Sequence, residues 1–487
     1  MAVDLGSSNG KILLCELDSS KRLSVRLVSR FIMPRLWLGG HLSINVYGIY
    51  EEICAAIRML ANEGVYIDSM GVDSWASDFG LVTEEGECVG LPVFYRDARC
   101  AGMTGEVEKT IDYAALYRLT TQRRMDESTL CQLLAVKRKS SLLARDMHIM
   151  SIGDLVMHFF TPCICNEFTV ASYTQMFSMS KMSWEDEVFD LFDLPRSLQT
   201  KIVWPGEQRG RTSGDVARYC GQGFDVISPA VHDTSSAVAA IPAVDHRDWA
   251  FIATGTWFLV GMELDKPGDI ELSYQNNFSN TGLAFKKNML KRNVSALWLI
   301  QECKRAWDKT EGGITYPQIV EQAEREEAFA AFIDTDAEEF FRSDYMPLSI
   351  VQYLKRTGQA DIEISEVGKI ARIIYESIAM KCRYALDKLI EVSGREVEVL
   401  YIVGGASGIV LLNGMIASAT GREVIAGVPD ASGVGNGLLQ AYGCGSISEQ
   451  ELRQIVSDGH KLTRYQPDES LPLWEESYRR FCNVCGC

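Results

Sequence analysis

The sequence lacks a long apolar run and an excess of basic residues. No stretch reaches the roughly 18 consecutive apolar residues of a membrane span, so no membrane partner is expected. The opening MAVDLGSSNGK is not built like a secretory signal, and a cytoplasmic location is expected. The 48 Lys and Arg residues are outnumbered by 65 Asp and Glu residues, and the formal net charge is -17. This balance argues against nucleic acid as the main partner, because phosphate backbones bind basic surfaces.

Histidine is scarce, and cysteine follows no pattern. The six histidines and 14 cysteines show no metal-ligand spacing, and the thiols are expected to be reduced and mostly buried. Cys482, Cys485 and Cys487 gather in the final segment CNVCGC. A loose terminus is expected there, with a metal or redox site as the alternative.

The length of the chain predicts more than one domain. Its 487 residues exceed one ordinary hydrophobic core, and two α/β halves follow one another. Each half opens with a strand, a turn rich in Gly, Ser or Thr, and a return strand. The expected domains are residues 1–241 and 242–445, followed by a helical tail at 446–487.

Hydrophobic periodicity predicts the main elements of both halves. In the first half, strands are expected at 11–17, 24–33 and 69–72, and a helix at 49–63. In the second half, strands are expected at 249–253, 257–264, 397–403 and 424–426, and helices at 366–392, 410–420 and 435–443.

The turn DLGSSNGK, from Asp4 to Lys11, is a candidate phosphate site. Its backbone N–H groups can converge on an anion, Lys11 can meet a phosphate oxygen, and Asp4 can hold Mg²⁺ or its water shell. The spacing differs from that of a P-loop, which excludes the strand–P-loop–helix class. The alternative is an ordinary polar hairpin turn.

Two turns of the second half are candidate nucleotide sites. Thr254-Gly255-Thr256 follows a strand as the first turn does, and two such turns can grip a polyphosphate from opposite sides. Gly404-Gly405 opens a strand-to-helix loop, where backbone can approach a flat ligand closely. Considered alone, the turn at Thr254 is equally an ordinary polar turn, and a loop like that at Gly404 is more often an ordinary tight connection between a strand and a helix.

Aromatic residues interleaved with charged ones suit a polyhydroxylated ligand. Trp75 and Asp78 lie in one such segment, and Arg96 and Asp97 lie in another. Rings pack on the C–H faces of sugars and charged groups bind hydroxyls; a surface ion-pair network around a core Trp is the alternative. Asp233, at the head of an expected helix, is either a helix cap or a base pointed into a cleft.

Taken together and in order, these segments resemble the FGGY family of carbohydrate kinases. The segments are AVDLGSSNGK, GVDSWASDFGLV, GLPVFYRDAR, VHDTSSAVAAIP, ATGTWFLVG, ALWLIQEC, YIVGGASG and ATGREVIAG. They extend from residue 2 to about residue 445, nearly the whole chain. Within the family, the similarity is greatest to kinases that act on L-rhamnulose.

The resemblance implies an α/β fold of two ribonuclease-H-like domains, of the actin-like ATPase superfamily, with an intervening cleft. It implies ATP and Mg²⁺, and transfer of the γ-phosphate to the C1 hydroxyl of a small ketose. L-Rhamnulose is the first expectation, and L-fuculose or another ketose or polyol is the alternative. A non-catalytic sugar sensor descended from a kinase is the alternative from another class. The implied partner is a small sugar, bound by a monomer or homodimer.

The resemblance also implies roles for individual residues. Asp233 would be the catalytic base, and Asp4 would lie near the metal. The sugar-binding positions would be Trp75, Ala76, Asp78, Arg96, Asp97, His232 and Thr234. The nucleotide-binding positions would be Gly6, Ser7, Ser8, Asn9, Gly10, Lys11, Gly255, Thr256, Asn293, Gln301, Gly404 and Gly405.

Three places depart from the family pattern. Ala76 stands where L-rhamnulose kinases usually have Gly, in the sugar pocket. Gly405 is followed by Ala-Ser-Gly-Ile, whereas the family loop typically reads Gly-Gly-Gly-x-Gln-Asn, so few contacts to the adenine are expected. The usual Trp-Asp pair before the first helix is replaced around residues 45–47.

Overall fold

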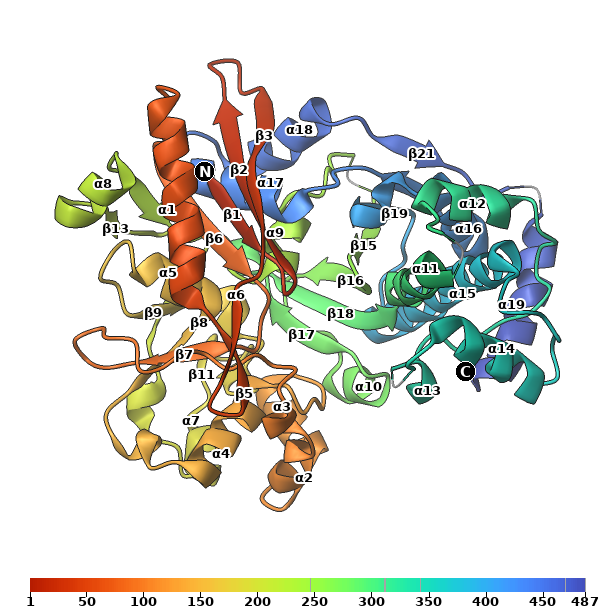
Figure 1. Cartoon of the computed structure of the whole chain (residues 1–487), viewed down its shortest axis with the longest axis horizontal. Coiled ribbons are helices and arrows are strands. Elements are labelled where there is room, and N and C mark those ends of the chain that lie inside the picture. The colour runs from red at the N-terminus through yellow and green to blue at the C-terminus, as the bar shows by residue number, and fades with distance from the viewer. Residues whose placement is uncertain (246, 311, 342, 469, 487) are drawn as a thin grey trace. The chain divides into compact units, whose positions relative to one another are not determined.

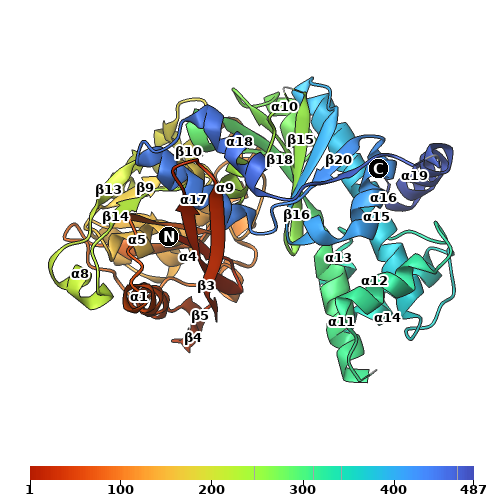
Figure 2. The ribbon, with the colours of Figure 1, turned by 90° about the horizontal axis from the view of Figure 1, so that it is seen from above.

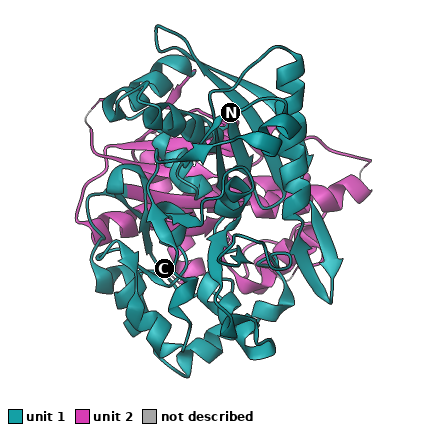
Figure 3. Cartoon of the chain, turned by 90° about the vertical axis from the view of Figure 1, so that its left-hand side faces the viewer, with its two compact units in different colours: residues 1–244, 263–290, 430–460 teal, residues 245–262, 291–429, 461–487 magenta. Residues whose placement is uncertain are grey.

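The computed structural model describes residues 1–245, 247–310, 312–341, 343–468 and 470–486 (Figure 1). The chain forms two compact units, each assembled from three separate stretches of sequence (Figure 3). Unit 1 comprises residues 1–244, 263–290 and 430–460, and unit 2 comprises residues 245–262, 291–429 and 461–487. The domain bounds expected from the sequence stay a prediction.

Unit 1 is built on a six-stranded mixed sheet of order β13-β14-β6-β1-β2-β3. Its strands are β1 (Ala2–Leu5), β2 (Asn9–Leu17), β3 (Leu23–Ile32), β6 (Ser69–Ser74), β13 (Gln208–Arg211) and β14 (Asp225–Ile227). β1 lies in the middle, antiparallel to β2 and parallel to β6. The strands expected in the first half are therefore confirmed.

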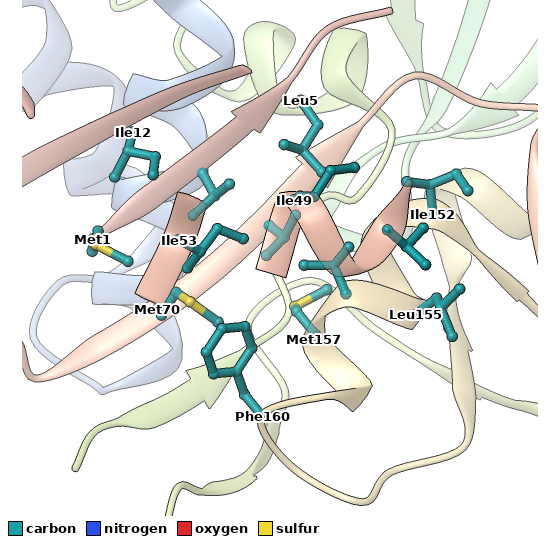
Figure 4. Packing of buried hydrophobic residues seen from close by; sticks show 14 of the residues in the cluster. Met1, Leu5, Ile12, Ile49, Ile53, Met70, Ile152, Leu155, Met157 and Phe160 are labelled. Carbon is teal, nitrogen blue, oxygen red and sulfur yellow. The ribbon is translucent and has the colours of Figure 1, made fainter. Parts of the chain in front are cut away.

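Helices α1 (Val46–Asn62) and α5 (Ile152–His158) bury their apolar residues against strands of this sheet (Figure 4). The side chain of Asn45 caps α1 by accepting a hydrogen bond from the Gly48 N–H group. The helical spacing expected at 49–63 is confirmed, with Ile49 and Ile53 fully buried. Burying each such side chain stabilises the fold by about 1.5–3 kcal/mol.

Two helices that carry the candidate site pack on the same sheet. α17 (Ala431–Gly443) contacts β1, β2 and β6, and it also contacts α9 (Asp233–Ala239). The helix expected at 435–443 is confirmed, and it begins four residues earlier. Unit 1 is thus completed by a helix that the chain reaches only after most of unit 2.

The rest of unit 1 consists of short elements. The strands are β4 (Arg35–Leu38), β5 (His41–Ile44), β7 (Phe79–Val82), β8 (His148–Ser151), β9 (Cys165–Glu167), β10 (Phe177–Ser178), β11 (Ser183–Trp184), β12 (Lys201–Val203) and β17 (Ser279–Gly282). The helices are α2 (Met103–Glu108), α3 (Tyr113–Thr120), α4 (Thr129–Lys139), α6 (Phe168–Ala171), α7 (Asp186–Leu191), α8 (Gly214–Cys220), α10 (Ile270–Gln275) and α18 (Glu449–Gly459).

Unit 2 has a sheet in which β15, β19 and β20 run parallel, with β16 and β21 antiparallel to their neighbours. These strands are β15 (Trp249–Thr254), β16 (Trp257–Leu264), β19 (Val399–Gly404), β20 (Glu423–Ala426) and β21 (Thr463–Tyr465). β16 and β18 (Asn288–Ser295) each extend past the boundary between the units. The strands expected at 249–253, 257–264, 397–403 and 424–426 are confirmed.

The long helix α15 (Val367–Ser393) organises the helices of unit 2 (Figure 2). It contacts α11 (Leu297–Thr310), α12 (Tyr316–Glu324), α14 (Met346–Arg356) and α16 (Val410–Thr420). The short helix α13 (Glu338–Phe341) packs against α14. The helices expected at 366–392 and 410–420 are confirmed.

The expectation of a loose C-terminal segment is wrong. Helix α19 (Leu471–Cys485) includes Cys482 and Cys485, whereas Cys487 lies outside the described residues. Trp474 and Phe481 lie two helical turns apart, and both rings are buried against Phe329 or Phe332. This apolar stripe holds the helix in place. Within the described ranges, no helix is both long and apolar enough to cross a membrane.

Candidate active site

Three charged side chains form a row across the centre of the unit 1 sheet. Asp4 on β1 pairs with Lys11 on β2 and with Asp73 on β6. Residues paired in neighbouring strands present their side chains to the same face of a sheet. One cation and two carboxylates therefore lie side by side where β1 and β6 end.

Helix α17 supplies polar partners to this row. The Ser432 hydroxyl donates to Asp4 Oδ2 at 2.8 Å, and the Asn436 amide donates to Asp73 Oδ2 at 2.6 Å. Lys11 Nζ lies 2.8 Å from Asp430 Oδ1 and 3.8 Å from Asp4 Oδ2. The N-terminal part of α17 thus belongs to the same site as the turn between β1 and β2.

The two carboxyl groups of the row are held away from water. Burial raises the pKa of Asp4, although Lys11 and the Ser432 hydroxyl act against the shift. Burial, reinforced by the negative charge of Asp4, raises the pKa of Asp73 well above its ordinary value. Asp73 Oδ1 is buried and accepts no hydrogen bond from a described residue. A cation at this place would stabilise both carboxylates.

The donor set suits a hard divalent cation that is shared with a phosphate ligand. Mg²⁺ prefers oxygen and is commonly held by one or two carboxylates plus phosphate groups. Among the residues that the structure describes, no group of three or more His, Cys, Asp or Glu could hold a metal alone. Asp4 and Asp73 alone offer two carboxyl groups, so a metal bound beside them would need further oxygen ligands, such as those of a phosphate.

Asp233 lies beside this row at the start of α9. Ser74, at the end of β6, forms a parallel bridge with His232, and its N–H group donates to the Val231 carbonyl at 2.7 Å. His232 occupies the cap position, so Asp233 is the first residue of the helix and not its cap. The Asp233 side chain is 34% exposed, and its Oδ1 accepts the Thr234 N–H at 2.5 Å. A partly exposed carboxylate thus faces solvent next to the buried charged row.

The side chains that flank Asp233 are more enclosed. His232 is buried; its Nδ1 lies 3.1 Å from the Ser235 hydroxyl, and its ring packs against Tyr173. Thr234 is also buried, and its hydroxyl donates to Asp233 Oδ1 at 3.1 Å. His232, Asp233 and Thr234 therefore form one fixed corner of the site.

A close approach between α9 and α17 fixes this corner. A Cβ atom on Gly435 would lie 1.8 Å from the Ser236 carbonyl oxygen, so only glycine fits at this position. The backbones of the two helices touch here. Asp233, on α9, and Ser432 and Asn436, on α17, are therefore held in a constant relation.

The Asp78 side chain holds the two predicted sugar segments together through hydrogen bonds. Its Oδ2 accepts hydrogen bonds from Trp75 Nε1 at 2.9 Å and from the Tyr95 N–H at 3.1 Å, and its Oδ1 accepts from Gln132 at 2.9 Å. Asp78 is 1% exposed, and burial raises its pKa to about 7. Asp78 therefore links the segment that contains Trp75 to the segment that contains Tyr95. Ala76 is half-buried and lies in the loop between Trp75 and Asp78.

Asp97 has a similar position. Its oxygens accept hydrogen bonds from the N–H groups of Leu42 at 2.8 Å and Arg99 at 2.9 Å, and His41 Nδ1 lies 2.9 Å away. Burial acts to raise the pKa of Asp97, but these partners outweigh it and hold the pKa below its ordinary value. Arg96, by contrast, is exposed, with its Nε donating to the Tyr95 hydroxyl at 3.0 Å.

The candidate phosphate turn is a tight hairpin. The Gly6 N–H donates to the Asn9 carbonyl at 2.9 Å, which leaves Ser8 and Asn9 exposed at the tip. Ser7 is half-buried, and its carbonyl accepts from the Arg35 guanidinium, which also lies 3.9 Å from the centre of the Phe94 ring. Gly10 pairs with Phe31 on the neighbouring strand β3, and the Phe31 ring leaves no room for a Cβ atom on Gly10. Arg35 thus connects the candidate phosphate turn to the segment around Phe94, one of the candidate sugar segments.

The candidate nucleotide turns meet within unit 2. The Thr254 hydroxyl donates to the Val403 carbonyl at 2.7 Å and accepts the Ala406 N–H at 2.9 Å, which joins the end of β15 to the loop after β19. Gly404 has φ of 90°, and a Cβ there would lie 2.4 Å from the Thr254 carbonyl oxygen. Gly255 and Gly405 are exposed at this junction.

Three further positions predicted for the nucleotide lie on neighbouring elements of unit 2. Thr256 precedes β16, and its carbonyl accepts the Trp298 N–H at 3.1 Å. Asn293 lies on β18 and Gln301 lies on α11. All three side chains are half-buried, which leaves part of each open to a ligand.

Sequence reasoning missed the contribution of α17. Asp73 lies within a recognised segment but received no role, and Asp430, Ser432 and Asn436 were not singled out. The available signal was the glycine content of α17, because closely spaced glycines in a helix indicate close backbone packing. Nothing local to residues 430–436 indicates which strands they pack against.

Comparisons with known proteins cover nearly the whole chain. Residues 1–240 match the N-terminal domain of the FGGY family of carbohydrate kinases, and residues 250–444 match its C-terminal domain. A rhamnulokinase from Bacteroides thetaiotaomicron is 32% identical over 99% of this chain and 98% of its own length. One from Oceanobacillus iheyensis is 30% identical over 96% of this chain and 97% of its own length.

Solved structures share the fold at low sequence identity. A ligand-bound xylulose kinase from Lactobacillus acidophilus has a TM-score of 0.80 at 14% identity, covering 100% of this chain and 98% of that one. A glycerol kinase from Plasmodium falciparum, solved with ADP, has a TM-score of 0.77 at 13% identity, covering 99% of this chain and 98% of that one.

Proposed function

Since the chain belongs to the FGGY family of carbohydrate kinases, we propose that it phosphorylates L-rhamnulose with ATP, giving L-rhamnulose 1-phosphate and ADP. Its fold is the two-domain fold of that family, whose domains correspond to the actin-like ATPase fold. The choice of sugar rests on the rhamnulokinases among its relatives. L-Fuculose, or another ketose or polyol, is the alternative within the same family.

One observation carries the proposed chemistry: Lys11, Asp4 and Asp73 form a row beside Asp233. Phosphoryl transfer requires alignment and charge stabilisation more than covalent chemistry. Asp233 would accept the proton of the C1 hydroxyl, and the partial exposure of its carboxylate between buried neighbours supports this role. Lys11 and the backbone N–H groups at the exposed tip of the turn between β1 and β2 would bind the phosphate oxygens.

Asp4 and Asp73 would hold Mg²⁺ at this site. Bound Mg²⁺ supplies positive charge that offsets the charge on the phosphate groups. The buried Asp73 Oδ1 atom, which accepts no hydrogen bond from a described residue, supports this assignment. Lys11 Nζ lies 3.8 Å from Asp4 Oδ2, so its positive charge would also offset the charge of this carboxylate.

The sugar would be bound in unit 1 and the nucleotide in unit 2. Trp75, Ala76, Arg96, His232 and Thr234 are proposed to line the sugar site. Asp78 and Asp97 would act there mainly by holding the two sugar segments. The nucleotide contacts are proposed to come from Gly255, Thr256, Asn293, Gln301, Gly404 and Gly405.

An ADP-release assay coupled to NADH oxidation, run across a panel of sugars, tests this function. The panel contains L-rhamnulose, L-fuculose, L-ribulose, D-xylulose, D-fructose, glycerol and an aldose. We expect the highest kcat/KM with L-rhamnulose, and phosphorus NMR of the product should place the phosphate on C1. Highest activity with glycerol or an aldose would refute the substrate. Sugar binding without any ADP release would instead favour a non-catalytic sensor.

A further inference from the structure

The carboxyl group of Glu167 is buried and takes no direct part in the proposed chemistry. Glu167 ends β9 and caps α6, where its Oε1 accepts the Thr169 N–H at 2.9 Å. Its Oε2 accepts the Thr169 hydroxyl at 2.5 Å and the Val231 N–H at 2.9 Å. A buried carboxyl group is costly unless hydrogen bonds satisfy its oxygens. Three donors do so here, and one of them belongs to the segment that leads to Asp233.

Thr169 extends this connection by one residue. Its hydroxyl oxygen accepts the His232 N–H at 3.1 Å while its proton is donated to Glu167. Val231 and His232 are the two residues before Asp233. The Val231 N–H group donates to Glu167, and the His232 N–H group donates to Thr169. The chain that enters α9 is held at two consecutive peptide groups.

Glu167 is itself fixed from behind by a buried ion pair. Its N–H group lies 3.2 Å from both carboxylate oxygens of Asp154, which pairs with Arg209. Both side chains of that pair are 0% exposed, and Arg209 Nε donates to the Ser228 hydroxyl at 2.6 Å. The support of the Asp233 segment therefore reaches into the rigid interior of unit 1.

Because α9 is short, Asp233 depends on contacts outside the helix to keep its position. The helix has only seven residues, and a helix so short has little stability of its own. Asp233 is its first residue, where a helix frays most easily. A base must stay aligned with the hydroxyl that it deprotonates, and a misplacement of about 1 Å can cost roughly 100-fold in rate.

We infer that Glu167 and Thr169 are positioning residues that hold Asp233 in line with the sugar hydroxyl through the N–H groups of Val231 and His232. This inference rests on the proposed role of Asp233 as the base. Neither residue needs to touch the substrate. Their loss should lower kcat more than it weakens sugar binding.

Thr169→Val tests the inference because it removes the hydroxyl and keeps the shape of the side chain. Thr212→Val is the matched control: Thr212 is also buried in unit 1, and its hydroxyl accepts the Phe224 N–H at 2.8 Å, away from Asp233. Both variants should lose similar thermal stability. Thr169→Val should lower kcat by roughly 10- to 100-fold, whereas Thr212→Val should keep the wild-type kcat. Thr169→Ser restores the hydroxyl and should restore turnover to within about threefold.

Calorimetry with the sugar provides a second readout. We expect Thr169→Val to bind the sugar within about threefold of wild type, so that the loss falls on kcat. Equal kcat values for Thr169→Val and Thr212→Val would overturn the inference. So would failure of Thr169→Ser to recover turnover. If Thr169→Val does not fold, Glu167→Met carries the same test with the same expected loss of kcat, because Met keeps the length of the side chain and its thioether is only a weak acceptor for the Thr169 hydroxyl and the Val231 N–H group.

Asp233→Asn separates this inference from the proposed function. A normal kcat in Asp233→Asn would overturn the role of Asp233 as the base, and the positioning role with it. A large loss in Asp233→Asn beside an unchanged Thr169→Val would overturn the positioning role alone.

Discussion

Gly435→Ala should disable the enzyme without touching any group that contacts a ligand. The added Cβ would lie 1.8 Å from the Ser236 carbonyl oxygen, whereas ordinary contacts begin at 3.4 Å. Helices α9 and α17 would have to separate by about 1.6 Å, because backbone atoms have no rotamer in which to evade the clash. Overpacking of this kind costs about 1–3 kcal/mol of stability, or more where the backbone must move.

The effect on turnover should exceed the effect on stability. Asp233 lies on α9, whereas the partners of Asp4 and Asp73 lie on α17, so separating the helices misaligns the base from the charged row. A shift of about 1 Å costs on the order of 100-fold in rate, and we therefore expect at least that loss in kcat. The assay is ADP release at saturating sugar and ATP, together with urea unfolding.

Gly414→Ala is the matched control. Gly414 lies inside α16, where a Cβ meets nothing within 4 Å. Alanine there should stabilise the protein by about 0.5–1 kcal/mol and leave kcat unchanged, because alanine favours a helix more than glycine does. A Gly435→Ala variant with wild-type kcat and stability would refute the close packing of α9 on α17.

Three further predictions concern individual side chains. Asp233→Asn should lower kcat by roughly 10²–10⁴ and largely keep sugar affinity by calorimetry, since base catalysis acts in the transition state. Burial raises the pKa of Glu167 to about 8 and that of Asp78 to about 7, so the folded state keeps protons that the unfolded state releases near pH 4. Stability to urea should therefore fall as pH rises from about 5 to 8. A steady rise in stability across that window would contradict the raised pKa values of Glu167 and Asp78. Ala76→Gly should shift kcat/KM among ketoses, by an amount on the order of 1–3 kcal/mol between close substrates, while KM for ATP stays constant.

Local pattern was sufficient for most elements of the two sheets. Apolar periodicity predicts β2, α1 and α15, because each of them buries one face or stripe against a core. The glycine-rich turn after β1 and the helix at Asp233 were predicted from other local signals, because turn residues and helix starts have characteristic sequences. The family resemblance then connected these segments to one chemistry.

The arrangement of the site was less accessible from the sequence. In sequence, Asp78 and Asp97 look like carboxylates that bind sugar hydroxyls, because each stands among aromatic and charged residues. In the structure, however, their oxygens accept hydrogen bonds from neighbouring N–H groups. Whether a carboxylate faces a ligand or braces a loop depends on partners that are distant in sequence. Asp73 and Asn436 illustrate this limit, since their contact joins β6 to a helix near the other end of the sequence.

The discontinuity of unit 1 has a consequence for how the chain acquires its structure during synthesis. β1 and β6 leave the ribosome long before α17, so the face that bears Asp4 and Asp73 must wait for residues 431–443 to cover it. Contacts between such distant segments slow folding, because a long loop must close before they form. A fragment ending at residue 244 would leave two carboxyl groups and an apolar sheet face open to water. No single cut in the backbone can therefore release unit 1 as an intact folding unit.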